Sequence, residues 1–202
     1  MKKKLLFVTI LSLFIFGGCT GTSTRNIYKT TLISVETSTS VDDYNYEIKI
    51  LEKDNKNYAL YEDEIITLLL YANSKVIKID FNNKTDSTMK IHWDNAIFID
   101  EYNLSNRVIH VGVKLTDSYN FQVPTIVSRR GRIEDNIVPA KNIKFINSEW
   151  RYSPLIKGNQ AVVSLLLPIE VADEIIEYIF KFEIQIDEEK IKEEENKFSP
   201  NK

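Results

Sequence analysis

Cysteine is almost absent from this sequence, since Cys19 is the only one in 202 residues. A disulfide needs two cysteines, so none can form within the chain. Glycine (6 residues) and proline (5 residues) are also scarce, which excludes collagen-like and low-complexity proteins. A folded domain in this chain must therefore be stabilised by an apolar core, and 43% hydrophobic residues are enough to build one.

An excess of basic charge is also missing, because 26 Lys and Arg residues face 29 Asp and Glu residues. Nucleic-acid-binding proteins usually carry a basic excess, so we expect no nucleic-acid partner. Histidine is limited to His92 and His110. Structural zinc takes four protein ligands and catalytic zinc takes three, so we expect no metal site and place both histidines on exposed strand faces.

Motifs for catalysis are lacking as well. The sequence has no G-x-S-x-G motif and no glycine-rich phosphate loop, and Cys19 is assigned to another role below. Nucleophilic catalysis needs an activated Ser, Thr or Cys beside a base, and no such set is recognisable here. We therefore expect no enzyme, although two carboxylates from separate strands could still converge as in a glycosidase.

The N-terminus carries the clearest signal that is present. Lys2, Lys3 and Lys4 precede an apolar stretch from Leu5 to Phe16, and two glycines follow it. A positive start, an apolar core and small residues before a cleavage site are the layout of a signal peptide. The apolar stretch is shorter than the roughly 20 residues that a membrane-spanning helix needs. We assign residues 1–18 to a signal peptide.

The segment Phe16-Gly17-Gly18-Cys19 resembles the lipobox of bacterial lipoproteins, with Phe16 where leucine is usual. The resemblance implies cleavage before Cys19, a diacylglycerol on its thiol and an N-acyl lipid such as palmitate on its amino group, with no other cofactor. It also implies a membrane partner and an extracytoplasmic location on the cell membrane or outer membrane. Thr20 follows where aspartate would favour inner-membrane retention, so the outer membrane is favoured in a two-membrane cell. Residues 19–26 then form a flexible tether.

Beyond the tether, apolar and polar residues alternate with a period of two. Such alternation predicts half-buried β-strands. The apolar sets are Tyr46/Ile48/Ile50, Ile77/Ile79/Phe81, Met89/Ile91/Trp93 and Ile176/Tyr178/Phe180/Phe182/Ile184/Ile186. Because these strands recur with short breaks and no long helix between them, we predict an all-β, mainly antiparallel domain over residues 27–187.

Four segments have more specific or more ambiguous patterns. The polar residues from Asn82 to Ser87 predict a hairpin loop between two strands. Residues 59–71 fit either a helix or a strand, and we favour a strand from about 65 to 71. Residues 171–177 could form one helical turn. The tail, residues 188–202, is rich in Glu and Lys and is predicted to be disordered, with a frayed helix over 188–195 as the alternative.

The stretch Val76–Asp100 combines an Asn-rich break, Trp93 and a second apolar cluster at Ile97-Phe98-Ile99. In this it resembles the immunoglobulin-like β-sandwich domains of bacterial envelope lipoproteins. The resemblance implies a two-sheet sandwich with Trp93 in its core, and short helices at most. The buried cysteine pair of antibody domains is absent.

Two surface features are candidate binding sites. Arg129, Arg130 and Arg132 surround Gly131, and guanidinium groups suit carboxylates or phosphates; the alternative is a solvated loop whose charges offset nearby acids. Trp150 and Tyr152 could contact a partner or a sugar, although aromatic side chains on strands more often pack in a core.

Together these features predict a lipid-anchored, non-enzymatic interaction or assembly module of the cell envelope, with an envelope protein as its partner. A carbohydrate- or small-ligand-binding surface lipoprotein is the first alternative, and an envelope hydrolase is the second. A structural spacer also fits the sequence.

Overall fold

A computed structural model describes residues 26–38, 45–54 and 56–192. The predicted signal peptide (1–18), Cys19 and nearly all of the tether (19–26) lie outside the described residues, as does the end of the tail from residue 193. The predicted all-β domain, residues 27–187, is described apart from residues 39–44 and 55.

More than half of the described residues lie in strands and few lie in helices, which confirms the all-β class. The strands are β1 Tyr28–Thr37, β2 Glu47–Lys53, β3 Lys56–Glu62, β4 Ile66–Ala72, β5 Ile77–Asn83, β6 Met89–Ile91, β7 Ile97–Ile99, β8 Ser105–His110, β9 Thr125–Val127, β10 Arg132–Pro139, β11 Ile143–Ile146, β12 Glu149–Tyr152, β13 Gln160–Val171 and β14 Glu174–Ile186. Two short 3₁₀ helices, η1 Leu115–Asp117 and η2 Ala140–Asn142, and a helical turn over 188–192 complete the structure.

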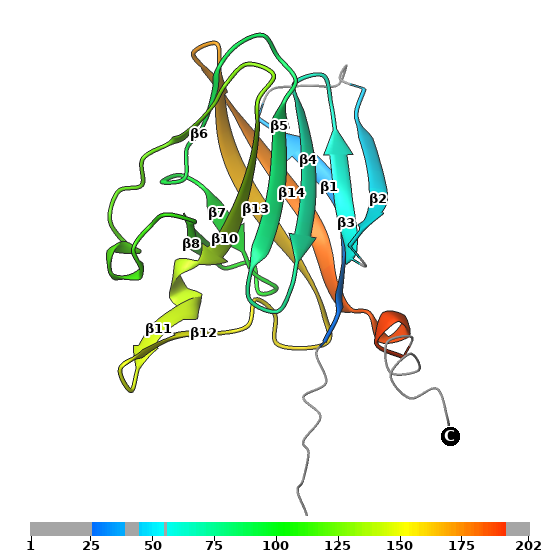
Figure 1. The fold of residues 1–202 in the computed structure, drawn as a ribbon, viewed down its shortest axis with the longest axis vertical. Coiled ribbons are helices and arrows are strands. Elements are labelled where there is room, and N and C mark those ends of the chain that lie inside the picture. Colours follow the sequence, from blue (N-terminus) through cyan, green and yellow to red (C-terminus); the bar gives the residue numbers. More distant parts are fainter. Residues whose placement is uncertain (1–25, 39–44, 55, 193–202) are drawn as a thin grey trace, which may run out of the picture.

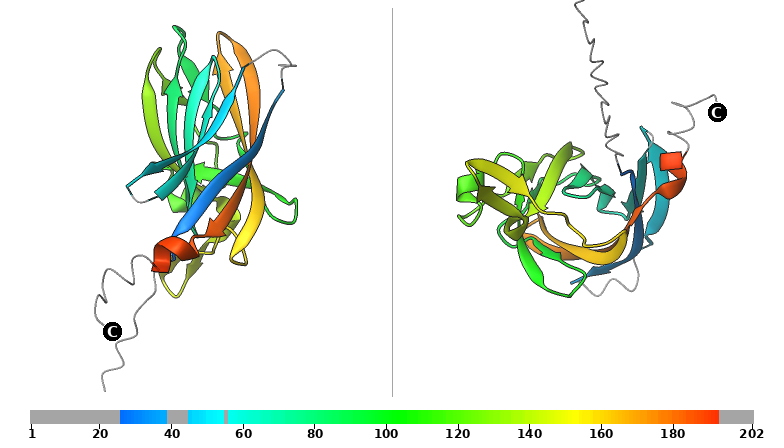
Figure 2. Two further views of the ribbon diagram at one scale, coloured as in Figure 1. Left: turned by 90° about the vertical axis from the view of Figure 1, so that its right-hand side faces the viewer. Right: turned by 90° about the horizontal axis from the view of Figure 1, so that it is seen from below.

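Nine of these strands form a closed barrel (Figure 1). Their order around the barrel is β14-β1-β3-β4-β5-β10-β8-β7-β13, and β13 pairs with β14 to close it. The view along the barrel in Figure 2 shows the strands surrounding a common interior. The predicted immunoglobulin-like sandwich would have two separate sheets, whereas the pairings here run continuously around one ring.

Alternation of side chains explains why these sequences close around a core. On β5, Ile77, Ile79 and Phe81 are buried, and the intervening residues are not. On β14 the same pattern buries Tyr178, Phe180, Phe182 and Ile184, and all these side chains belong to one apolar cluster inside the barrel. Because side chains in a strand alternate between faces, each strand contributes one face to the interior.

The joint between β1 and β3 is the weakest in the ring. One parallel residue pair, Lys29 with Asn57, connects the two strands, whereas β2 pairs with β3 along its whole length. The buried Thr30 reinforces this joint from β1. Its hydroxyl accepts a hydrogen bond from the Ala72 backbone N–H of β4 at 2.8 Å and donates to the Ala72 carbonyl at 3.4 Å. A side chain therefore replaces part of the missing backbone ladder.

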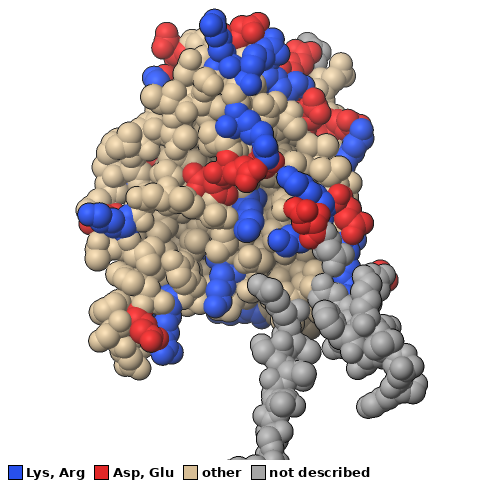
Figure 3. All heavy atoms as spheres, in the orientation of Figure 1, with Lys and Arg blue, Asp and Glu red and all other residues tan. Residues whose placement is uncertain are grey.

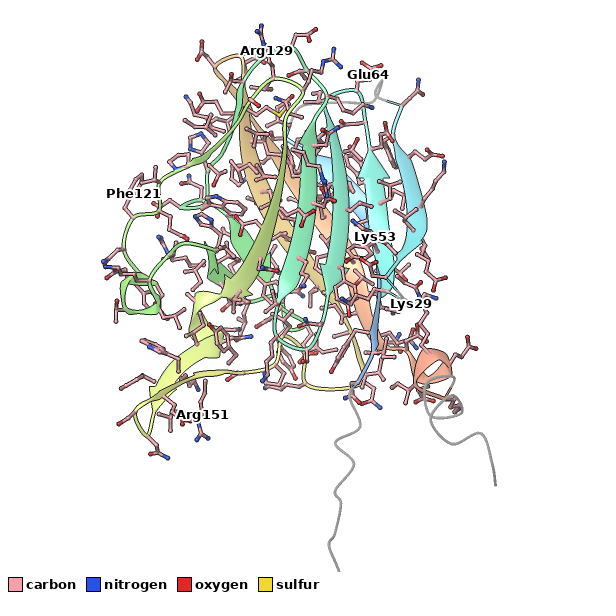
Figure 4. The ribbon with its side chains drawn as sticks, viewed as in Figure 1. Lys29, Lys53, Glu64, Phe121, Arg129 and Arg151 are labelled. Carbon is pink, nitrogen blue, oxygen red and sulfur yellow. The ribbon has the colours of Figure 1, made fainter. Side chains whose placement is uncertain are left out.

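We name the two ends of the barrel by their loops. The basal end comprises Ile27, residues 73–76, 100–104 and 153–159, and Asp187. Backbone hydrogen bonds join Asp187 to Ile27, Ile186 to Asn159 and Leu155 to Ser74 there. The apical end comprises residues 63–65, 84–88, 128–131 and 172–173. Figure 4 labels Glu64 and Arg129 at the apical end.

The structure bears on three expectations for individual segments. The favoured strand over 65–71 is confirmed, since β4 covers Ile66–Ala72. The alternative helical turn over 171–177 is wrong, because β13 and β14 join there through a tight turn at Ala172 and Asp173. The described part of the tail is helical at 188–192, in line with the frayed-helix alternative.

The hairpin predicted at Asn82–Ser87 is also wrong. β5 pairs with β4 and β10, while β6 pairs with β13 and β9, so the two strands that flank the loop are not partners. The loop instead crosses the apical end of the barrel. The buried Asn83 fixes it by donating to the carbonyls of Ser87 (2.8 Å) and Ser128 (3.0 Å). A short polar segment has the same sequence pattern whether the next strand pairs with the preceding one or the chain crosses the barrel end to another strand.

Candidate partner-binding surface

A β-hairpin made of β11 and β12 projects from the barrel and carries the predicted aromatic pair (Figure 1). The register places Phe145 opposite Trp150 and Ile143 opposite Tyr152. Directly opposed residues share one face of a two-stranded sheet, so these four side chains form an aromatic face. The Phe145 and Trp150 rings lie 5.1 Å apart between centroids, with 61% and 38% of their surfaces exposed.

The other face of the hairpin is mostly charged. Lys144 opposes Arg151, and Ile146 opposes Glu149. The tip, Asn147 and Ser148, has φ angles of 52° and 64°, and positive φ at both central residues is the geometry of a tight type I′ turn. The base is fixed by a 2.7 Å hydrogen bond from the Ser153 N–H to the Asn142 carbonyl. The hairpin is therefore short and ordered, with one aromatic face and one mostly charged face.

The base of the hairpin packs on a small apolar cluster outside the barrel. Ile109, Val138 and Ala140 are its buried members, and Ile143 of the hairpin and Leu115 of the neighbouring loop pack against them. Only the base of the aromatic face has this support, because Phe145 and Trp150 lie farther out and stay exposed. Trp150 and Tyr152 are therefore surface residues, and core packing does not explain their presence.

A second exposed apolar surface lies on the loop between β8 and β9. Tyr119, Phe121 and Val123 are each more than 70% exposed, and Ile126 follows on β9 at 67%. We call these four residues the flank. In Figure 3 this side of the molecule shows few charged groups, whereas the opposite side and the apical end show many; Figure 4 labels Phe121 there. Sequence reasoning missed the flank, although Tyr119, Phe121 and Val123 alternate with polar residues.

The flank loop is held firmly in spite of its exposure. Gln122 points inward between Phe121 and Val123 and is 2% exposed. Its amide donates to the Val108 carbonyl at 2.8 Å and to the Trp93 carbonyl at 3.3 Å. Arg107 pairs with Asp94 beneath the same loop. The exposed rings are thus presented on ordered backbone, which lowers the entropy cost of binding a partner.

A cavity of about 480 Å³ lies between the hairpin and the start of the flank loop. Val76, Ile109, Val113, Leu115, Val138 and Tyr152 supply its apolar lining. His110, Lys78, Asn73 and Asn136 supply polar groups. This size and mixture are ordinary for a small-molecule site.

His110 is held in place by its neighbours at the edge of this cavity. Its ring stacks on the buried Trp93 indole at 4.5 Å between centroids, and its Nδ1 lies 3.0 Å from an Asp135 carboxylate oxygen. Asp135 also accepts the Val111 N–H at 2.9 Å. In nucleophilic catalysis a His–Asp pair activates a neighbouring Ser, Thr or Cys, and the described residues that line the cavity include none of these.

His92 is separate from this pair. Its Nε2 lies 2.7 Å from the Glu170 carboxylate, which also bonds to Lys90. The hydrogen bonds from Lys90 and His92 hold the pKa of Glu170 below its usual range. Within the described residues, no three His, Cys, Asp or Glu side chains are grouped closely enough to hold a metal ion.

Two of the three predicted arginines are already paired at the apical end. Arg130 makes a bidentate contact with Asp86 at 2.9 and 3.1 Å, and Arg132 pairs with Asp80 and Glu134. The hydrogen bonds with Asp86 raise the pKa of Arg130 and lower that of Asp86. Arg129 is exposed, and the described structure gives it no ion pair. For all three arginines to bind one anion, Arg130 and Arg132 would first have to break their ion pairs with the carboxylates.

Comparison of the chain with protein-family models, with curated proteins and with solved structures finds no match. None of the helices within the described residues has the length and apolar character to cross a membrane. The fold and the surface therefore describe this protein only as a filled, closed β-barrel with ordered, exposed aromatic residues along one side.

Proposed function

We propose that this chain is a lipid-anchored, extracytoplasmic protein of a bacterial cell envelope that acts as a non-enzymatic protein-interaction module. The charged start, the apolar stretch and the single cysteine at position 19 support the anchor. One buried acyl chain holds a protein only reversibly, and two or more hold it firmly. An immunoglobulin-like architecture has the buried Trp93 in its favour and the closed ring of strands against it.

The flank is the observation that carries the interaction proposal. Gln122 fixes the backbone that carries Tyr119, Phe121 and Val123, and pairing of β9 with β6 fixes Ile126. The barrel interior is already filled by the protein's own core. Rigid exposed aromatic residues supply binding area at little cost in conformational entropy, and they are common among the residues that dominate protein interfaces. We therefore expect the flank to bind another envelope protein.

The test is crosslinking in living cells followed by mass spectrometry of the proteins that co-purify. The variant Tyr119→Ser/Phe121→Ser removes the two rings from the flank and should lose the dominant partner. The matched control Ile33→Ser/Ile175→Ser removes two exposed apolar residues from β1 and β14 on another wall and should keep it. Cys19→Ala tests whether the anchor is required. Equal recovery of the partner by both double variants would remove the flank from consideration.

Small-ligand or glycan binding is the second candidate, and the 480 Å³ cavity is the observation that favours it. Tyr152 would stack on the ligand, while His110, Lys78 and Asn136 would hydrogen-bond to it. A ligand from a glycan array that raises the melting temperature of the wild type, and not that of Tyr152→Ser, would support this function. No stabilisation by any glycan would count against it.

A further inference from the structure

The outer half of the hairpin has no partner within the described protein. Ile143 packs against the small cluster outside the barrel, but Phe145 and Trp150 on the same face extend beyond it. Two-stranded hairpins are marginal in water on their own. An exposed aromatic face on such an element indicates that another surface covers it.

The hairpin points toward the end of the barrel at which the described chain begins. β12 leads directly into the basal loop 153–159, and this loop hydrogen-bonds to Ser74 and to Ile186, beside Ile27. In Figure 1 the hairpin and the start of β1 both lie at the lower end, and the first view of Figure 2 agrees.

More apolar side chains are exposed at the same end. Tyr102 and Leu104, in the basal loop between β7 and β8, are each 59% exposed. Lys157 lies 4.9 Å from the centre of the Tyr102 ring and so joins this loop to 153–159. Basic residues accompany the aromatic ones, since the basal end together with residues 140–152 contains five Lys or Arg and four Asp or Glu. The chain as a whole carries a net charge of −3.

The tether limits how far the basal end can stand from a membrane. Seven residues, 20–26, separate Cys19 from Ile27, and a fully extended chain spans at most about 25 Å over that number. Trp and Tyr favour the membrane–water interface, and basic side chains favour anionic headgroups. The exposed aromatic and basic residues of the basal end are of the types that favour a membrane surface, and the tether keeps this end close to the membrane.

We propose that the basal end lies against the bilayer, with Phe145 and Trp150 of the hairpin inserted at the interface and Tyr102 beside them. The bilayer is one that contains anionic phospholipid. This inference rests on the lipid anchor proposed at Cys19. The hairpin then acts as a second contact that orients the barrel, so that the apical end faces away from the membrane.

The two tryptophans make a direct test possible, because Trp93 is fully buried and Trp150 is exposed. The full-length lipidated protein is reconstituted into vesicles of phosphatidylethanolamine and phosphatidylglycerol that carry bromine on their acyl chains. Bromine quenches tryptophan only at contact range, so Trp150 emission should fall and shift to the blue. Trp150→Phe, which retains only Trp93, should show no quenching.

A transplanted tryptophan supplies the matched control. In the Trp150→Phe background, Phe121→Trp places an exposed indole on the flank instead of the hairpin, and it should stay unquenched. Quenching of both positions would mean that the barrel has no fixed orientation, and the inference would be wrong. A protein that floats with the vesicles while its Trp150 stays unquenched would overturn the hairpin contact but keep the anchor.

Other surfaces that could cover the aromatic face of the hairpin would give different results. A second copy of the chain would shift Trp150 emission to the blue in a concentration-dependent way and without quenching, which also overturns the proposal. Failure of the protein to float with the vesicles at all would refute the anchor, and the hairpin contact would fall with it.

Discussion

Asp63 shows how one buried carboxylate organises the apical end. Its oxygens accept hydrogen bonds from the hydroxyls of Tyr61 and Tyr178, both at 3.0 Å, and from the backbone N–H groups of Ile65 (2.8 Å) and Ile66 (2.6 Å). A buried charge is tolerated only when it is well hydrogen-bonded. These four donors meet that requirement and fix the turn between β3 and β4.

This arrangement predicts sensitivity to alkaline pH. Burial, and secondarily the Asp63 charge, raise the pKa of Tyr61 far above its usual value. Above pH ~10 the unfolded chain would lose this proton while the folded one keeps it, so the free energy of unfolding should fall by about 1.4 kcal/mol per pH unit. Urea unfolding over a series of pH values should show a shallower loss for Tyr61→Phe. Identical slopes for both proteins would contradict the assignment.

Asn83 gives a second prediction at this scale. Its amide donates to two carbonyls, and its Oδ1 accepts the Thr85 N–H at 2.9 Å in a site with no exposure. Asn83→Ala would leave buried groups without partners, and each unsatisfied group costs about 1–3 kcal/mol. Chemical denaturation should therefore show a loss of at least about 2 kcal/mol. Asn82→Ala, next to it and less buried, is the control and should change little.

At the scale of elements, the hairpin should be dispensable for stability. Phe145 and Trp150 contact each other and not the core, so replacing both with Ser should change the free energy of unfolding by less than about 1 kcal/mol. Phe98→Ala, on the core side of β7, should cost about 3–5 kcal/mol. Urea denaturation of both variants checks this. A large loss in the hairpin variant would show that the hairpin supports the fold.

Strand positions could be predicted from sequence where one face is buried. Ile77, Ile79 and Phe81 alternate because the barrel interior accepts one side of β5. The same rule fails on β2, where Ile50 is 51% exposed, because β2 lies outside the ring and has little core to face. Alternation reports that a strand exists, but it does not say which strand pairs with it. Closure depends on pairings between residues far apart in sequence, such as Thr31 with Glu183.

The candidate site was only partly predictable for a related reason. Trp150 and Tyr152 stood out by residue type, but sequence could not separate exposed aromatic residues from those in the core. Of the other Tyr residues, Tyr61 on β3 is buried, whereas Tyr46, just before β2, is 58% exposed. The arginines were visible as a cluster, whereas their partners Asp80 and Asp86 lie about 50 residues away in sequence and come close only in the fold.

For the whole molecule, the joint between β1 and β3 should open first. Thr30→Val keeps the shape of the side chain but removes the hydroxyl that serves the Ala72 backbone. We expect a loss of about 1–3 kcal/mol, since buried backbone groups lose their partner. Hydrogen exchange should also speed up at Ala72 and along β1, and stay slow in β13. Uniform acceleration throughout the barrel would indicate that the ring opens as one unit.

The pairing of β14 with both β1 and β13 determines when the barrel can fold during synthesis. Among the described strands, β14 is the last to leave the ribosome, yet it pairs with the first, β1, over residues 178–186. Until it emerges, the growing chain has two unpaired strand edges and an open interior, so it cannot settle into a stable partial barrel. Because β14 closes the ring, this topology postpones folding of the barrel until β14 has been synthesised. For the same reason, a product that ends before β14 would remain open and be a substrate for proteases.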